Sequence, residues 1–351
     1  MKMRETITTI AEKSGVSKST VDRALKNQPG VSPETRELVL RVASECGYRK
    51  NIAGSALRRQ NSPVVIAVLF RWQLFDEQIK EGLLAAQEEY YDLGVRLRFF
   101  DMKQGDYQEQ YQILESLKGQ DIKGIILKPV DHPEIVKVVN ELESLNVPVV
   151  AVSSDLPSSK RFRLIGQNYY RAGRVAGELM ATALHGKGRV AIFHESTQYH
   201  AYTERERGFE AFLQENAKEI QVKEIICADE GSSDNYQLAL KYLQENADIE
   251  GILCTGISYP VIARAVLDSG NEEVTLIGYD IFEDTQELFE KRAIKFVITQ
   301  NPFREGYEAV RTLFQYVTTA NKGTGSSYFT TLNIVNRESI VDIHKHELFK
   351  I

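Results

Sequence analysis

The sequence has few cysteines and no long apolar run. Only three cysteines occur in 351 residues, and they lie far apart at Cys46, Cys227 and Cys254. This spacing excludes a disulfide framework and the close ligand pairs of a zinc site, so we expect three buried thiols in a reducing compartment. No run approaches the length of a membrane span, and the N-terminus, MKMRET, starts polar, unlike a secretory signal. We therefore expect a soluble, intracellular protein that contacts no membrane.

The chain as a whole also lacks an excess of positive charge, since its net charge is -6. The charge is unevenly distributed, however. Residues 1–60 hold 12 Lys and Arg against 6 Asp and Glu, whereas the remainder holds 31 against 43. A basic head before an acidic body predicts that only the head contacts a polyanion. The length predicts two or three domains, and the 42% of hydrophobic residues is enough to bury a sizeable core.

Two short helices joined by a turn are predicted in the stretch Thr6–Lys26, TITTIAEKSGVSKSTVDRALK. Gly15 interrupts the first helix, and the side chain of Ser17 can cap the second. A helix-turn-helix presents the first residues of its second helix to the major groove of DNA. The polar side chains in that position, which can donate hydrogen bonds to bases or phosphates, are Lys18, Ser19, Thr20 and Arg23. The alternative is a small helical hairpin with a solvated polar face.

A third helix is predicted between Ser32 and Gly47, because a capping serine and a proline at the first helical position precede apolar residues at helical spacing. It completes a three-helix head at residues 1–48. The stretch 49–62 is basic and weakly apolar, and Gly54 and Ser55 lower its helix propensity. We expect it to be a hinge or linker that folds only against a partner.

From residue 63 onward, short apolar runs alternate with amphipathic helical patterns. Examples are the predicted strand Val64–Phe70, the helix Tyr107–Leu117, the strand Gly124–Pro129 and the helix Pro133–Leu145, and a second such series begins at Asn168. This alternation predicts parallel sheets covered by helices on both faces. Two such sheets make two lobes, and a ligand would bind in the cleft at the carboxyl ends of their strands.

The order of these parts resembles the LacI/GalR family of transcriptional regulators over essentially the whole chain. The head matches the family's N-terminal signature through TITTIAEKSGVSKSTVDRAL and GVSPETRELVLRVASECGY. The body carries the similar stretches IGQNYYRAGRVAGELM, ERERGF, LIGYD, ITQNPFREGYEAV and LNIVNRES. The resemblance implies an all-α helix-turn-helix head and an α/β body of the periplasmic-binding-protein-like type I, with three crossovers between two parallel-sheet lobes. It further implies that residues 63–351 form an effector-binding and dimerisation domain. Its first lobe would hold about 63–165 and 301–328, and its second about 166–300 and 329–351.

Under this resemblance, the head and the linker hold the residues that contact DNA. Lys18, Ser19 and Arg23 match the base-reading positions, and Thr8 and Thr20 match phosphate contacts. The linker corresponds to the family's hinge helix, in which the matching DNA-contacting positions are Asn51, Leu57 and Arg58. Leu57 corresponds to the apolar wedge that enters the minor groove and bends the duplex.

The resemblance also implies the residues of the ligand site. Arg205 matches the family's ligand-binding arginine, Asp280 its aspartate after Gly-Tyr, and Gln300 its glutamine at the hinge. A guanidinium and a carboxylate suit a polyol, because each can bind two hydroxyls at once. Further ligand-binding residues expected around the same cleft are Trp72, Phe75, Asp101, Lys128, Asp155 and Asn168. Phe75 could stack on a sugar ring or belong to the ordinary core.

The resulting hypothesis is a homodimeric transcriptional regulator of the cytoplasm, associated with the nucleoid through a near-palindromic operator in double-stranded DNA. A small molecule in the cleft, a sugar or sugar derivative, would control it. The alternatives are a sugar-processing enzyme, or a sugar sensor that does not bind DNA, with an accessory helical head. The sequence has no G-x-S-x-G, P-loop or dinucleotide-binding motif, so we expect no catalytic residue and no cofactor. His194 and His200 lie six residues apart on a predicted loop and define no metal site.

Overall fold

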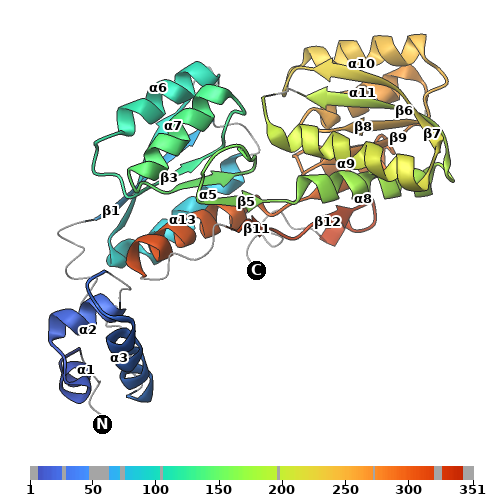
Figure 1. The fold of residues 1–351 in the computed structure, drawn as a ribbon. Helices are drawn as coiled ribbons and strands as arrows, with labels where there is room; N and C mark the ends of the chain where they lie inside the picture. The colour runs from blue at the N-terminus through green and yellow to red at the C-terminus, as the bar shows by residue number, and fades with distance from the viewer. Residues whose placement is uncertain are drawn as a thin grey trace.

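The computed structural model describes residues 7–25, 29–46, 63–71, 76–102, 106–195, 198–271, 273–319 and 326–342. Figure 1 shows a bundle of three helices and two lobes, each built on one β-sheet with helices on both faces. Among these residues, no helix combines the length and apolar character that a membrane crossing requires. The predicted fold class, a helical head followed by a two-lobed α/β body, is confirmed.

The head consists of α1 (Ile7–Ser14), α2 (Lys18–Leu25) and α3 (Pro33–Glu45). Gly15, between α1 and α2, has a φ of 68°, a left-handed conformation that favours glycine. Ser17 Oγ accepts a hydrogen bond from Thr20 N at 3.1 Å and so caps α2, as the sequence predicts. The buried core of the head comes from all three helices and consists of Ile10, Ala11, Val21, Ala24, Val39, Val42 and Ala43.

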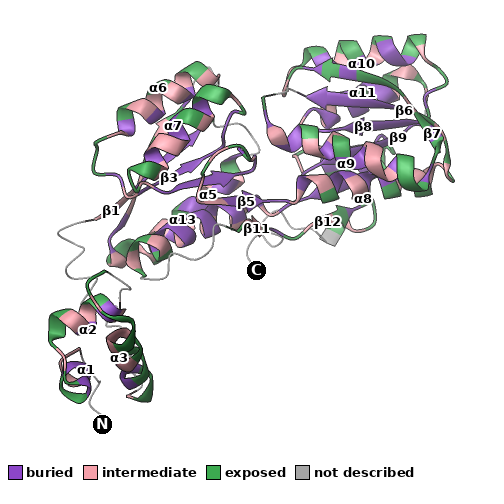
Figure 2. Ribbon diagram, viewed as in Figure 1, coloured by how far each residue is buried: buried purple, intermediate pink, exposed green. Residues whose placement is uncertain are grey.

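The first lobe contains a parallel sheet in the order β11-β5-β4-β3-β1-β2. Its strands are β1 (Val64–Phe70), β2 (Val95–Asp101), β3 (Gly124–Leu127), β4 (Val149–Val152), β5 (Arg163–Gly166) and β11 (Tyr328–Phe329). One face packs against α5 (Asp76–Glu89) and α13 (Pro302–Thr318), and the other against α6 (Tyr107–Leu117) and α7 (Pro133–Ser144). A 3-10 turn at Tyr91–Leu93 precedes β2. Figure 2 shows the buried residues along the strands and the exposed residues on the outer helix faces.

The second lobe contains a sheet in the order β12-β10-β9-β8-β6-β7, in which only β12 runs antiparallel to its neighbour. Its strands are β6 (Lys187–Glu195), β7 (Glu219–Ala228), β8 (Gly251–Cys254), β9 (Thr275–Tyr279), β10 (Phe296–Thr299) and β12 (Asn333–Val335). Helices α8 (Tyr169–Ala183) and α9 (His200–Asn216) cover one face. The other face is covered by α10 (Asp234–Glu245), α11 (Tyr259–Ser269) and α12 (Thr285–Glu290), and a short 3-10 turn lies at Ile340–Asp342.

The chain passes between the two sheets three times among the described residues. The first crossing follows β5 at Gln167 and Asn168, the second follows β10 at Gln300 and Asn301, and the third lies at residues 330–332, between β11 and β12. The three crossings lie close together and form the hinge between the lobes. Any movement of one lobe relative to the other must therefore involve these segments.

Two sequence-based expectations need correction. Cys227 is exposed, although a buried thiol was predicted, because β7 is an edge strand in which most residues are exposed. Cys254 is buried as expected, and Cys46 is partly exposed. The short helix α12 was not predicted, since its six residues hold too few apolar positions to show a helical period.

Candidate functional site

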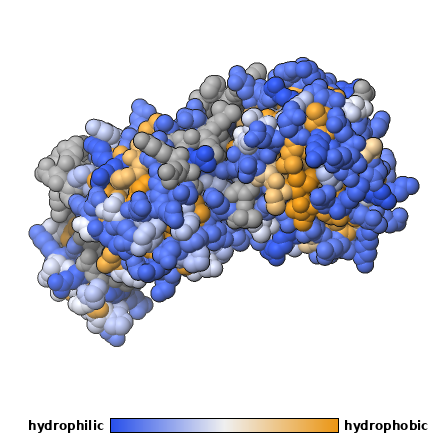
Figure 3. All heavy atoms as spheres, turned by 90° about the horizontal axis from the view of Figure 1, so that it is seen from above, coloured by the Kyte–Doolittle hydropathy of each residue, from blue (hydrophilic) through white to orange (hydrophobic). Residues whose placement is uncertain are grey.

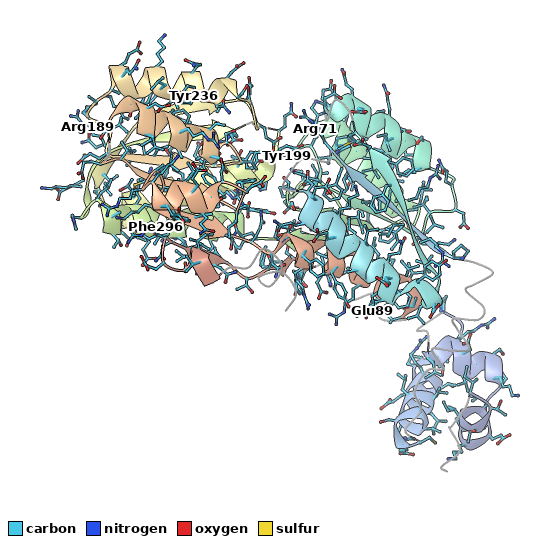
Figure 4. All side chains as sticks on the ribbon, turned by 180° about the vertical axis from the view of Figure 1, so that it is seen from behind. Arg71, Glu89, Arg189, Tyr199, Tyr236 and Phe296 are labelled. Carbon is cyan, nitrogen blue, oxygen red and sulfur yellow. The ribbon has the colours of Figure 1, made fainter. Side chains whose placement is uncertain are left out.

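The carboxyl ends of both sheets face each other across a nearly filled cleft. The cavity there has a volume of about 20 Å³, enough for roughly one water molecule. Its lining comes from both lobes and consists of Lys128, Ser153, Tyr199, Ala201, Tyr202, Arg205, Ile257, Asp280 and Gln300. In Figure 4, Arg71 at the end of β1 and Tyr199 before α9 lie on the facing sides of the two lobes. The lobes are therefore closed on each other.

Arg205 lies in the centre of this cleft and is only 2% exposed. Its Nη1 donates a hydrogen bond to the Thr255 carbonyl oxygen at 2.8 Å, and its Nη2 donates to Gln167 Oε1 at 3.4 Å. The guanidinium carbon lies 3.8 Å from the ring centroid of Tyr279. These contacts hold the planar fork in one orientation, which is the condition for bidentate recognition of a ligand.

Asp280 lies beside Arg205, at 3.9 Å between Oδ2 and Nη2, and adopts a left-handed φ of 66° at the end of β9. Gln300 Nε2 donates to Asp280 Oδ2 at 3.1 Å, so the two residues predicted from the sequence contact each other. Burial raises the pKa of Asp280, and Arg205 opposes this shift only in part. The structure thus brings the predicted arginine, aspartate and glutamine into one cluster.

Lys128 enters the same cavity from the first lobe, directly after β3. Its ammonium lies 3.7 Å from the carboxylate of Asp76 and 4.6 Å from the ring centroid of Tyr199, which belongs to the second lobe. Burial lowers the pKa of Lys128, but the carboxylates of Asp76 and Glu230 raise it by more, so the side chain stays charged. A positive charge from each lobe therefore faces the cavity.

Backbone and apolar contacts at the cleft hold the lobes together. Asp131 N donates to the carbonyl oxygen of Gln198 in the other lobe at 2.8 Å. The loop that carries Asp131 is fixed by the buried Gln110, whose amide bonds Lys128 O at 3.0 Å and Val130 N at 2.9 Å. An apolar cluster spanning both lobes consists of Val130, Tyr169, Tyr199, Ala201 and Tyr202.

Several buried polar atoms around the cavity have no hydrogen-bond partner among the described residues. They include a donor, Arg205 Nε, an acceptor, Gln300 Oε1, and the hydroxyls of Tyr169 and Tyr279. Unpartnered buried polar groups are costly. A ligand that offers both donors and acceptors, as a polyol does, could satisfy them.

The sequence reasoning did not find all the residues at this site. Ser153, Gln167, Tyr199 and Tyr202 belong to the cleft, although only their neighbours in the sequence were singled out. Ser153 stands two residues before the predicted ligand residue Asp155, and Gln167 stands next to Asn168. Tyr199 and Tyr202 lie within six residues of Arg205, and this proximity was the signal available. Glu195, at the end of β6, accepts a hydrogen bond from Ser258 N at 2.6 Å and so fixes the loop that carries Thr255 O, the partner of Arg205.

The remaining predicted ligand residues lie outside the cavity lining or outside the described residues. Asp155 forms a bidentate ion pair with Arg161, and Asn168 caps α8 by accepting a hydrogen bond from Arg171 N at 3.0 Å. Asp101 is exposed at the end of the edge strand β2. Trp72 and Phe75 lie outside the described residues. Binding roles for these five residues stay predictions.

The predicted DNA-contacting residues of the head lie on α1 and α2. Lys18, Ser19 and Arg23 are exposed on α2, while Thr20 and Thr8 are partly exposed. Since the apolar residues of α2 face the head core, its polar face is available to a groove. Asn51, Leu57 and Arg58 lie outside the described residues.

Two protein-family descriptions match the chain. The one for "Periplasmic binding protein domain" matches residues 71–322, and the one for "Bacterial regulatory proteins, lacI family" matches residues 6–51. The chain is 24% identical to the HTH-type transcriptional regulator MalR of Clostridium butyricum over 348 residues, covering 95% of this chain and 98% of the relative. It is 23% identical to the ribose import binding protein RbsB of Bacillus subtilis, covering 65% and 72% of the two chains.

A solved structure is also similar. The crystal structure of GanP, a glucose-galactose binding protein from Geobacillus stearothermophilus, superposes with a TM-score of 0.72 at 25% identity. The match covers 80% of this chain and 99% of that one. The two-lobed body is thus shared with sugar-binding proteins, and the head with DNA-binding regulators.

Proposed function

Because the chain belongs to the lacI family of bacterial regulatory proteins, with a body of the periplasmic binding protein domain family, we propose that it is a homodimeric transcriptional repressor controlled by a sugar or sugar derivative. Two heads bind the half-sites of a near-palindromic operator, and the effector binds between the lobes. The protein acts in the cytoplasm, where its operator DNA is accessible. No catalytic step is part of this proposal.

The proposal of an effector site rests on one observation, the buried guanidinium group of Arg205 in the cavity between the lobes. Hydrogen bonds to Thr255 O and Gln167 hold this group in place, and Asp280 lies beside it. This cluster supplies paired donors and acceptors on one side of the cavity, and Lys128 supplies a charge from the other lobe. Sugar-binding relatives share the body, which supports a polyol as the ligand. Since the closed cavity holds roughly one water, the effector enters only when the lobes separate.

The DNA half rests on the head. Lys18, Ser19 and Arg23 present donors on the exposed face of α2, and the body carries the negative charge of the chain. Donors at these positions suit guanine and phosphate acceptors in a major groove. The linker positions Asn51, Leu57 and Arg58 complete the proposed contact set by reaching the adjacent minor groove.

Dimerisation is supported by exposed apolar side chains on the first lobe. Leu84 on α5, Tyr91 before β2 and Phe99 on the edge strand β2 are 42%, 52% and 37% exposed. These three side chains form an apolar edge that suits a second copy of the chain, because pairing would bury it. Figure 3 shows the face seen from above as mainly hydrophilic, with hydrophobic patches over both lobes.

The experiment that tests the proposal joins two assays on the full-length protein. A thermal-shift screen of sugars and sugar phosphates identifies ligands that bind the folded state. Gel-shift titrations with promoter fragments from its own genome then measure operator binding with and without each hit. We expect at least one sugar to raise the melting temperature and to change DNA affinity. Failure to bind any fragment at low salt, with or without ligand, would refute the regulator.

A further inference from the structure

Glu305, in the first turn of α13, has a carboxyl group that contacts both the floor of the cleft and the hinge. It is fully buried at 0% exposure. Its Oε2 accepts a hydrogen bond from Ser153 Oγ at 2.6 Å, and its Oε1 lies 3.4 Å from Thr330 Oγ1. Ser153 lines the cavity after β4, and Thr330 lies on the third crossing. The carboxyl thus joins the floor of the cleft to the hinge.

The second and third crossings contact Glu305 directly, and the first is connected to it through Thr330. Thr330 N donates to Gly166 O at 2.8 Å, immediately before the first crossing, and Glu305 N donates to Asn301 O at 3.0 Å in the second. The Tyr169 hydroxyl lies over Gly166, 2.4 Å from where a Cβ atom would stand. Separation of the lobes, which must involve these segments, would therefore disturb the surroundings of Glu305.

No positive side chain forms an ion pair with Glu305 among the described residues. The charged groups that face it are Asp280, whose carboxylate disfavours ionisation, and Arg205, whose guanidinium favours it, with the Tyr169 phenol alongside. Charged residues on the helices around it are engaged elsewhere: Asp76 of α5 with Lys128, and Glu308 of α13 with Arg304 and Arg311. Burial, only in part offset by the hydrogen bond from Ser153, raises the pKa of Glu305 to about 8.

We propose that Glu305 is a positioning residue of the hinge, a buried neutral carboxyl group that stabilises the closed lobes and links their closure to the uptake of one proton. In the closed state the protonated acid shares hydrogen bonds with Ser153 and Thr330. When the hinge opens and water reaches the carboxyl group, its pKa falls and the proton leaves. Raising the pH towards 8 therefore favours the open cleft. The inference rests on the proposed function, because lobe closure is the movement through which the effector would act.

The test measures the distance between the lobes without sugar or DNA. Spin labels are attached to cysteines introduced at Glu134 and Asp234, exposed positions in the first turns of α7 and α10, after replacement of Cys46 and Cys227 by serine. Distance distributions of the full-length protein are recorded by pulsed electron double resonance between pH 5 and 9.5. The wild-type background should shift progressively to longer distances as the pH rises towards 8 and should change little above that value.

Two variants decide whether Glu305 causes this shift. Glu305→Gln cannot ionise and keeps both hydrogen-bonding partners, so it should retain the short distance at every pH. Glu305→Met, neutral and of similar length, provides a second variant if the glutamine protein is poorly folded. Glu308→Gln removes an ion-paired carboxylate from the same helix and should behave as the wild type does.

A pH-independent wild-type distance, or a wild-type shift retained by both neutral variants at position 305, would overturn the inference. Since no sugar or DNA is present, such a result would leave the proposed regulator standing. Conversely, a protein that binds neither DNA nor sugar could still show the proton-linked closure.

Discussion

The backbone of Gly173 on α8 lies so close to Arg205 on α9 that a Cβ atom at position 173 would stand 1.9 Å from the Arg205 carbonyl oxygen. In the same way, a Cβ atom at position 208 on α9 would stand 2.0 Å from the carbonyl oxygen of Tyr170 on α8. The two helices therefore cross at a pair of glycines. The position of the central arginine of the cleft depends on this contact between helices.

Replacing Gly173 with alanine should separate α8 from α9. We expect the free energy of unfolding to fall by about 3 kcal/mol, at the upper end for overpacking, because backbone atoms rather than a flexible side chain occupy the space. Effector binding should weaken as well, since Arg205 moves with α9. Chemical denaturation followed by circular dichroism measures the first effect. Glu178→Ala, on the exposed face of the same helix, is the control and should change stability little.

Replacing Arg205 with lysine should abolish the response to the effector but keep DNA binding. Lysine retains the charge beside Asp280 but cannot bond Thr255 O and a ligand with the same planar fork. Loss of one or two charge-assisted hydrogen bonds predicts an affinity for the sugar lower by roughly a hundredfold. Isothermal titration measures this affinity, and gel shift without ligand is the control. Wild-type affinity in the lysine variant would remove Arg205 from the proposed site.

Replacing Arg23 with alanine should weaken operator binding by about 1–3 kcal/mol, the range for a base-contacting arginine. Sugar binding should be unchanged, because the head contributes nothing to the cavity lining. Gel-shift titrations at several salt concentrations measure the loss. Arg41→Ala, which removes an exposed charge from α3 rather than α2, is the matched control. An equal loss in both variants would indicate a general electrostatic effect instead of base reading.

The pH dependence of stability should carry a contribution from Glu305. Its folded pKa of about 8 lies above the ordinary value of 4.5, so the folded protein keeps the proton where the unfolded chain releases it. The resulting stabilisation is complete below pH 4.5 and is lost as the pH rises towards 8. Glu305→Gln should therefore be close to wild type at pH 5 and more stable than wild type at pH 9. Differential scanning calorimetry at both values measures the difference, and a constant difference would contradict the assigned shift.

The sequence by itself determined the order and type of most elements, although not the short helix α12. Hydrophobic periodicity, helix caps and turns depend on residues that are neighbours in the sequence. It was therefore possible to predict, to the residue, the ends of Val64–Phe70 and Tyr107–Leu117 and the helix caps at Ser17 and Ser32. The resemblance of motifs around Arg205, Asp280 and Gln300 indicated a ligand site because those residues stand in recognisable local patterns.

Only the tertiary structure decided which of these residues meet and what surrounds them. Arg205, Thr255 and Gln167 are distant in the sequence and come together because two sheets and three crossings place their ends at one cleft. Tertiary structure also decided the surroundings of Glu305, which in the sequence resembles any other acidic residue of an amphipathic helix. Its burial between Ser153 and Thr330 depends on the long-range packing of the hinge, which no local pattern records.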